Sequence, residues 1–526
     1  MRSKLLSDNL LSVDQLISLI NSIELIDISK ISSIQYYTQY NIIDQLYQQS
    51  HLHIALSQID PSQSIDSTTS HTHNLLHLHQ NNPQFNHEFI VQLLQNHDNN
   101  VHLNNIIFNL ITNEYFNRSA LLPISNTLQH SASDTHSTNT IKLYTCMYYE
   151  NISVGLLCNL LYHSQVFNNV NECNLIELID YCIRQITVLC TPQCAPATSS
   201  RTCNTALYNT MNEKWATIQY SISIQCITIL RYITDNSTQL STSCIHRLND
   251  VHDLLVQSSV LLCCSKPWQR INDQHTEYYI DNQWIVVSTD ANAIQLTDVE
   301  LQLWLTVRNL LTSTQFISTY AYNQYRRNHV LQMNDVLTSE LLKQLPILKD
   351  SKRNIESLHF VDVPGNTVQS NLPLIEVIAE HRQHLIDHTD IKQVINNTAQ
   401  NYLSNNTHDD DMCILNQLYS NQTLYDLLDS PTCTVCGAAA EKRCSRCKLE
   451  WYCSRQCQVD NWVAHKPTCD LIYNDDLFQQ QQKASQYGEV QSTSNTQSIE
   501  HKPLIQTINN NVTDQGITYN PMDEMD

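Results

Sequence analysis

A cluster of cysteines with one histidine constrains this chain more than any other feature of its sequence. Within 37 residues the ligand pattern is Cys433-x2-Cys436-x7-Cys444-x2-Cys447-x5-Cys453-x3-Cys457-x7-His465-x3-Cys469. Structural zinc takes four S or N ligands in a closed tetrahedral site, so eight ligands predict two sites. A segment this short buries too little apolar surface to fold alone, and bound metal supplies the missing free energy. A disulfide cluster is the alternative, which a reducing compartment disfavours.

The same segment resembles the MYND zinc finger family. The likeness rests on the core Tyr452-Cys453-Ser454-Arg455-Gln456-Cys457-Gln458 and on Trp462-x2-His465-Lys466. The resemblance implies interleaved binding of two structural Zn²⁺ ions. The first ion would be held by Cys433, Cys436, Cys453 and Cys457, and the second by Cys444, Cys447, His465 and Cys469. Spacing alone leaves sequential pairing of the ligands open.

MYND fingers bind peptides, and the resemblance assigns that role to three positions here. Residues matching Ser445, Gln458 and Trp462 contact short proline-containing segments. An indole offers a flat apolar platform, and a glutamine amide can hydrogen-bond an extended backbone. The alternative is that Trp462, like Trp451, only covers the metal sites.

Charge argues against nucleic acid as the partner of this finger. Six Lys or Arg against three Asp or Glu give residues 433–469 a local charge of +3, but the whole chain carries −22. A phosphate-binding protein usually presents a broad basic face. We therefore expect protein partners and no nucleic acid.

Composition predicts a mainly helical protein that is not an enzyme. Only five glycines occur in 526 residues, and none lies in a phosphate-binding GxGxxG or GxxxxGK[ST] loop. We predict no catalytic residues. No apolar run is long enough to cross a membrane, and the first 30 residues lack the apolar core of a signal peptide. The twelve cysteines outside the finger are interpreted as small core residues of a cytosolic protein.

Apolar periodicity divides the chain into helical regions separated by polar segments. Leu156, Leu157, Leu160 and Leu161, for example, share one helical face. Successive helices of this kind favour an irregular, solenoid-like scaffold, and residues 277–288 suggest a short hairpin. The predicted parts are 1–126 (N-terminal helical region with a polar insertion at 59–84), 127–140 (polar linker), 141–350 (central helical domain), 351–430 (helical and linker region), 433–469 (zinc finger) and 470–526 (disordered tail).

Blocks outside the finger resemble a family of MYND-finger proteins that assemble axonemal dynein arms. These blocks are Leu178–Cys182, Ile229–Asp235, Ser265–Trp268 and Leu341–Pro346. The resemblance implies a cytoplasmic assembly factor, also found near the ciliary base, that acts as a chaperone adaptor. Its implied partners are a leucine-rich-repeat dynein assembly factor, a heat-shock chaperone, an immunophilin co-chaperone and dynein chains as clients. No membrane partner is implied.

Two other functional classes carry MYND fingers. Lysine methyltransferases place the finger near the N-terminus, inside a SET domain with a glycine-rich cofactor loop, whereas here it is C-terminal and glycine is scarce. A transcriptional co-regulator that recruits proline-containing peptides is the second alternative. It would be nuclear, whereas an assembly factor would be cytoplasmic.

Overall fold

The computed structural model describes a helical unit and, separately, the zinc finger. It describes residues 11–57, 101–121, 123–125, 136–168, 170–190, 207–271, 276–280, 283–287, 296–360 and 379–403, and most of 433–469 except 437, 439, 441, 447–449, 464, 467 and 468. The predicted polar insertion at 59–84, the segment 404–432 and the tail at 470–526 lie outside the described residues.

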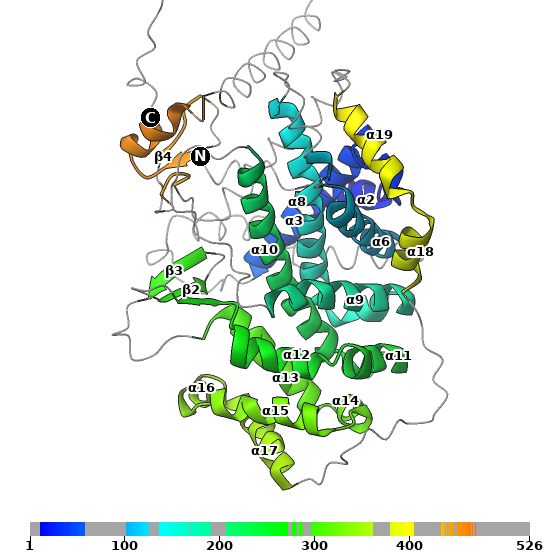
Figure 1. Ribbon diagram of the computed structural model, residues 1–526, viewed down its shortest axis with the longest axis vertical. Helices are drawn as coiled ribbons and strands as arrows, with labels where there is room; N and C mark the ends of the chain where they lie inside the picture. The colour runs from blue at the N-terminus through cyan, green and yellow to red at the C-terminus, as the bar shows by residue number, and fades with distance from the viewer. Residues whose placement is uncertain are drawn as a thin grey trace, which may run out of the picture. The chain divides into compact units, whose positions relative to one another are not determined.

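The first half of the helical unit contains its longest helices, joined by short helical turns (Figure 1). In chain order they are α2 (Val13–Asn21), η1 (Ile28–Lys30), α3 (Ile34–Ser57), α6 (Val101–Phe116), η4 (Asn117–Leu121), α8 (His136–Leu161), η5 (Ser164–Asn168), α9 (Glu172–Leu189) and α10 (Leu207–Asp235). Helix α8 packs against both α3 and α10, and α10 also packs on α9.

The second half of the unit is built from shorter elements. They are η6 (Ser237–Gln239), α11 (Thr242–His246), η7 (Arg247–Val251), α12 (Leu254–Val260), η8 (Leu261–Ser265), α13 (Asp298–Thr312), α14 (Thr314–Thr319), α15 (Gln324–Val336), α16 (Ser339–Gln344), η9 (Pro346–Leu348), α17 (Lys349–Ser357), η10 (Leu358–Phe360), α18 (Glu380–His388) and α19 (Ile391–Leu403). The predicted helical class is thus confirmed, whereas the solenoid-like arrangement stays a prediction.

Local sequence explains where several helices begin. Ser12 and Gln15 form a reciprocal capping box at the start of α2. The Asn171 side chain accepts the Cys173 N–H at 3.2 Å to cap α9. At the start of α13, Thr297 accepts the Glu300 N–H, and the acidic first turn complements the helix dipole.

One three-stranded antiparallel sheet interrupts the helices. It comprises β1 (Gln269–Ile271), β2 (Thr276–Ile280) and β3 (Gln283–Val287), with β2 in the middle. Ile280 pairs with Gln283 across β2 and β3, which confirms the predicted hairpin. Strand β1 was not predicted, because three residues are too few to show an alternating pattern.

Two predicted boundaries fall inside helices and are wrong. Helix α8 begins at His136, so the linker predicted at 127–140 is helical in its last part. Helix α17 runs from Lys349 to Ser357 across the predicted end of the central domain at 350. In both places the helix contains polar residues, whose composition resembles that of a linker.

A single hydrophobic core links the start of the unit to its end. It extends from Leu16 in α2 to Val394 in α19 and includes the four leucines of the α8 face. Helix α18 packs on α6 and α9, and α19 packs on η1 and η4. In Figure 1 the yellow α18 accordingly lies beside α6. The last described helices therefore pack on the first ones.

Candidate metal centre

The zinc finger brings seven of the eight predicted ligands into two clusters. Cys433, Cys436, Cys453 and Cys457 form the first, with their sulfur atoms all within 4.8 Å of one another. Cys444, His465 and Cys469 form the second by the same measure. Cys447, the predicted fourth ligand of that site, lies outside the described residues. Ligands from distant parts of the segment interleave, so sequential pairing does not fit.

Sulfur spacing in the first cluster fits a tetrahedral zinc ion. Zn–S bonds of about 2.3 Å at the tetrahedral angle place two sulfurs about 3.8 Å apart. Cys453 Sγ lies 3.3 Å from Cys436 Sγ and 3.7 Å from Cys457 Sγ. Cys457 Sγ lies 3.9 Å from Cys436 Sγ. A disulfide would require about 2.05 Å, so these separations indicate a metal site.

The second cluster has the same spacing and is more enclosed. Cys444 Sγ and Cys469 Sγ are 3.7 Å apart. Both cysteines and His465 are buried, and His465 stacks edge-on against Trp462 with ring centroids 5.9 Å apart. The two clusters are compatible with the two structural zinc ions that the sequence predicts.

Short backbone links fold the finger around the ligands. β4 (Lys442–Arg443) pairs with β5 (Trp451–Tyr452), and residues 455–463 are helical. The Ser454 hydroxyl accepts the Cys457 N–H at 3.3 Å and caps that helix. Cys457 therefore sits in the first turn, where the helix dipole favours a thiolate.

The four thiols of the first cluster influence one another's pKa values. Hydrogen bonds with Cys436 and then Cys433 raise the pKa of the Cys453 thiol to about 12. Burial also tends to raise the pKa of Cys433, but backbone N–H groups of Cys453, Cys436 and Val435 lower it to about 6. Four thiols this close cannot all ionise unless a metal compensates their charge, and zinc binds cysteine as thiolate.

The predicted peptide-contacting residues differ in their exposure. Trp462 is half-buried and packs against the small core of the finger formed by Cys433, Cys444, Tyr452 and their neighbours. Gln458 is only 7% exposed, and Ser445 is half-buried. The assignment of these three to peptide binding stays a prediction. Val463 was not among the predicted contact residues, yet it is 87% exposed and so offers an apolar surface to a partner. Its position directly after Trp462 was the sequence signal that could have indicated this.

Comparison with known proteins agrees with this geometry. The MYND finger family matches residues 433–469, so this part of the chain is a MYND-type zinc finger. Over 367 residues the chain is 28% identical to zinc finger MYND domain-containing protein 10 homolog of Drosophila melanogaster, which covers 64% of this chain and 79% of the relative. That similarity includes most of the helical unit.

Other relatives share a segment of about the size of the finger. Ubiquitin carboxyl-terminal hydrolase 19 of Arabidopsis thaliana is 50% identical over 42 residues, 8% of this chain and 6% of the relative. Dauer abnormal formation protein 25 of Caenorhabditis elegans is 49% identical over 41 residues, 8% of this chain and 10% of the relative. No solved structure matches the chain.

Proposed function

We propose that this chain is a non-enzymatic adaptor in the cytoplasmic assembly of axonemal dynein arms. The observation that carries the proposal is similarity to one kind of protein beyond the finger, over 64% of the chain. Blocks in α9, α10 and α16 resemble dynein-arm assembly factors in the same order along the chain. A match the size of the finger would not support this role, because a ubiquitin carboxyl-terminal hydrolase also matches over 42 residues.

Each unit has a separate task in this proposal. The MYND finger is a protein-binding module, and we assign to it the leucine-rich-repeat assembly factor as partner. The helical unit presents a large surface to a heat-shock chaperone, an immunophilin co-chaperone and dynein chains. Among the described residues, no helix is both long and apolar enough to cross a membrane.

The absence of catalysis is part of the proposal. A structural zinc site with four protein ligands has no open position for a reactive water. The sequence also lacks the glycine-rich loops that hold nucleotide cofactors. Recognition of partners is the remaining role for a zinc-folded finger on a helical scaffold.

Affinity purification from cells that build motile cilia tests the proposal. The tagged full chain should be cytoplasmic and should recover dynein heavy chains together with the leucine-rich-repeat factor. Deleting 433–526 should remove that factor, whereas deleting 471–526 should not. A nuclear location with transcription factors among the recovered proteins would support the co-regulator alternative instead. Origin in an organism that never builds motile cilia would also contradict the proposal.

A further inference from the structure

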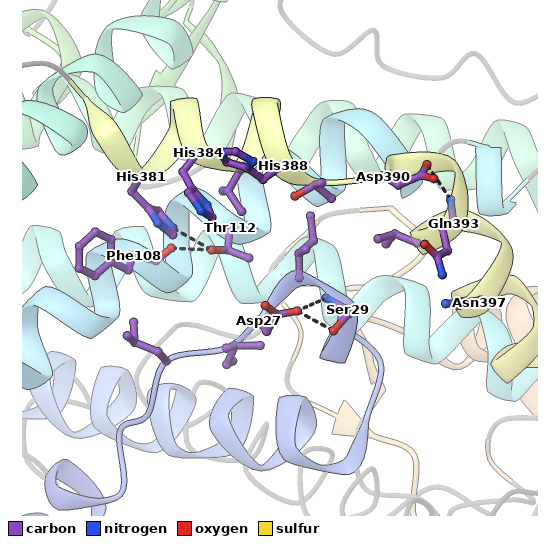
Figure 2. Close-up of a pocket in the computed structure, with 16 residues that line it drawn as sticks. Asp27, Ser29, Phe108, Thr112, His381, His384, His388, Asp390, Gln393 and Asn397 are labelled. Carbon is purple, nitrogen blue, oxygen red and sulfur yellow. Dashed lines mark hydrogen bonds between the residues drawn. The ribbon is translucent and has the colours of Figure 1, made fainter.

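A cavity of about 700 Å³ lies in the helical unit, away from the zinc sites in the chain. It is formed by the segment at 25–29, one face of α6, and the helices α18 and α19 (Figure 2). This volume is within the range of known ligand-binding pockets, about 300–1,000 Å³. The function proposed above makes no use of it.

Part of the cavity wall is apolar. Phe108 of α6, Leu385 of α18 and Val394 of α19 contribute to them. Leu25 also lines the cavity and is 55% exposed, although most large apolar side chains of the described helices are buried. An exposed leucine beside a cavity provides a contact for an apolar side chain of a partner.

Two carboxylates lie at fixed positions along the cavity. Asp27 accepts the Ser29 N–H at 2.8 Å and also the Ser29 hydroxyl, and these hydrogen bonds lower the pKa of Asp27. Asp390 accepts the N–H groups of Lys392 at 3.1 Å and Gln393 at 3.2 Å. In the structure these hydrogen bonds hold Asp27 at the start of η1 and Asp390 at the start of α19.

The lining carries no compensating Lys or Arg among the described residues. Lys30 does not line the cavity and donates to Gln35 Oε1 at 3.0 Å, although its charge contributes, after the Ser29 hydrogen bonds, to the lowered pKa of Asp27. Three histidines of α18 complete the lining, and His384 and His388 are exposed, with ring centroids 4.6 Å apart. The lining therefore carries two carboxylates and no Lys or Arg side chain among the described residues.

Helix α18 is held firmly enough to form a stable wall. The Glu177 carboxylate of α9 accepts the N–H groups of His381 at 2.7 Å and Arg382 at 3.2 Å. His381 Nε2 lies 3.1 Å from the Thr112 hydroxyl, whose own proton is donated to Phe108 O at 3.0 Å. The Thr112 hydroxyl thus connects α18 to α6 (Figure 2).

We propose that this cavity docks a basic, amphipathic peptide segment of a protein partner. An aliphatic side chain would enter between Leu25, Phe108 and Leu385. A Lys or Arg next to it in the peptide would pair with Asp27 or Asp390. Charge complementarity selects this occupant, because the lining offers fixed negative charge beside an apolar surface and would repel an acidic segment. This second docking surface does not depend on the finger.

Fluorescence anisotropy on the zinc-loaded full chain tests the proposal. The probe is a fluorescein-labelled peptide of two Leu-Leu-Lys-Arg-Gln repeats, and the matched control peptide replaces Lys and Arg with Glu. Asp27→Asn and Asp390→Asn each retain a capping side chain but remove the charge. We expect each to weaken probe binding about two- to fivefold, the range for one exposed ion pair. Leu25→Ser, at an exposed position, should also weaken it.

Asp387→Asn is the control for overall charge. Asp387 lies on the same helix α18, accepts a hydrogen bond from Gln383 at 2.9 Å, and does not line the cavity. This variant should bind the probe as the unmodified chain does. Equal weakening by Asp387→Asn, unchanged binding in the Asp27 and Asp390 variants, or comparable binding of the acidic peptide would each overturn the proposal.

Discussion

Each cysteine of the first zinc cluster supplies one of the four ligands of one zinc ion. Replacing Cys453 with Ser leaves three thiols around a site that needs four ligands. Because zinc binding supplies the folding free energy of so small a module, we expect loss of at least one of the two zinc ions and unfolding of the finger. The far-UV signal of the helical unit should remain, since its core contains no finger residue.

Metal analysis and circular dichroism of the purified variant check this outcome. Cys264→Ala is the matched control, because Cys264 is exposed and outside both clusters, and it should keep both ions. If Cys453→Ser retained both ions, the ligand assignment would be wrong. A collapse of the helical signal would show that the two units do not fold separately.

Substitutions at Trp462 and Lys466 distinguish apolar from electrostatic recognition of a peptide by the finger. Trp462 is half-buried beside the zinc sites, whereas Lys466 is exposed. Truncating an aromatic anchor can cost about 2 kcal/mol or more, while an exposed charge usually contributes less than about 1 kcal/mol. We therefore expect Trp462→Ala to weaken binding of a proline-containing partner peptide more than Lys466→Ala does.

Calorimetric titration of both variants, each confirmed to carry two zinc ions, is the appropriate measurement. Equal losses with zinc intact would favour recognition by charge. Loss of zinc in Trp462→Ala would show instead that the indole mainly covers the metal sites.

Glu150 links the stability of the helical unit to pH. Its buried carboxylate accepts hydrogen bonds from Asn117 Nδ2 and Tyr181 OH, each at 2.9 Å. Burial and, next, the Glu114 carboxylate raise the pKa of Glu150 from 4.5 to about 7. The folded state therefore keeps a proton that the unfolded chain releases, and this contribution to stability is lost as pH rises from 4.5 through about 7.

Glu150→Gln should reduce that pH dependence, because glutamine resembles the protonated carboxyl. Between pH 5 and pH 8 the unmodified chain should lose up to about 3 kcal/mol more stability than the variant, at about 1.4 kcal/mol per pKa unit. Urea unfolding followed by helical circular dichroism at both pH values measures the difference. Identical pH dependence in the two proteins would mean that Glu150 titrates in its ordinary range.

At the scale of elements, Gly155 allows α3 and α8 to approach closely. A Cβ at this position would lie 2.6 Å from Cε2 of the Tyr47 ring. Gly155→Ala gains up to about 1 kcal/mol of helix propensity, but overpacking of this kind typically costs about 1–3 kcal/mol. We expect net destabilisation of about 0.5–2 kcal/mol, visible as a lower urea midpoint.

A double-mutant cycle with Tyr47→Leu provides the control. Without the ring the alanine meets no clash, so Gly155→Ala should then be neutral or stabilising. Equal destabilisation in both backgrounds would place the effect elsewhere in α8.

Sequence patterns predicted elements well where the signal is local. The apolar face of α9 follows the helical period, β2 and β3 are rich in aromatic and β-branched residues, and the spacing of cysteine and histidine indicates the finger. The cavity beside α18 was not predictable in the same way. His381, His384 and His388 do share a helical face by spacing, but their proximity to Asp27 depends on a contact between segments some 350 residues apart, which no local pattern encodes.

At the scale of the whole molecule, two units with different sources of stability serve one proposed role. The helical unit is stabilised by one continuous core, and the finger by its metal sites. Family resemblance indicated the interleaved ligands that the finger shows, while spacing alone left the pairing open. Two domain boundaries predicted from composition lie inside helices, because a polar helical segment and a linker have similar amino-acid compositions. The proposed role in dynein assembly rests on similarity to one relative over 64% of the chain.

The direct test of that role is electron microscopy of axonemes from cells that lack the protein. We predict axonemes that are built but short of outer and inner dynein arms, with heavy chains unstable or retained in the cytoplasm. The full chain should restore the arms, deletion of 471–526 should restore most of them, and deletion of 433–526 should restore few. Normal arms and normal motility in the complete null would contradict the account.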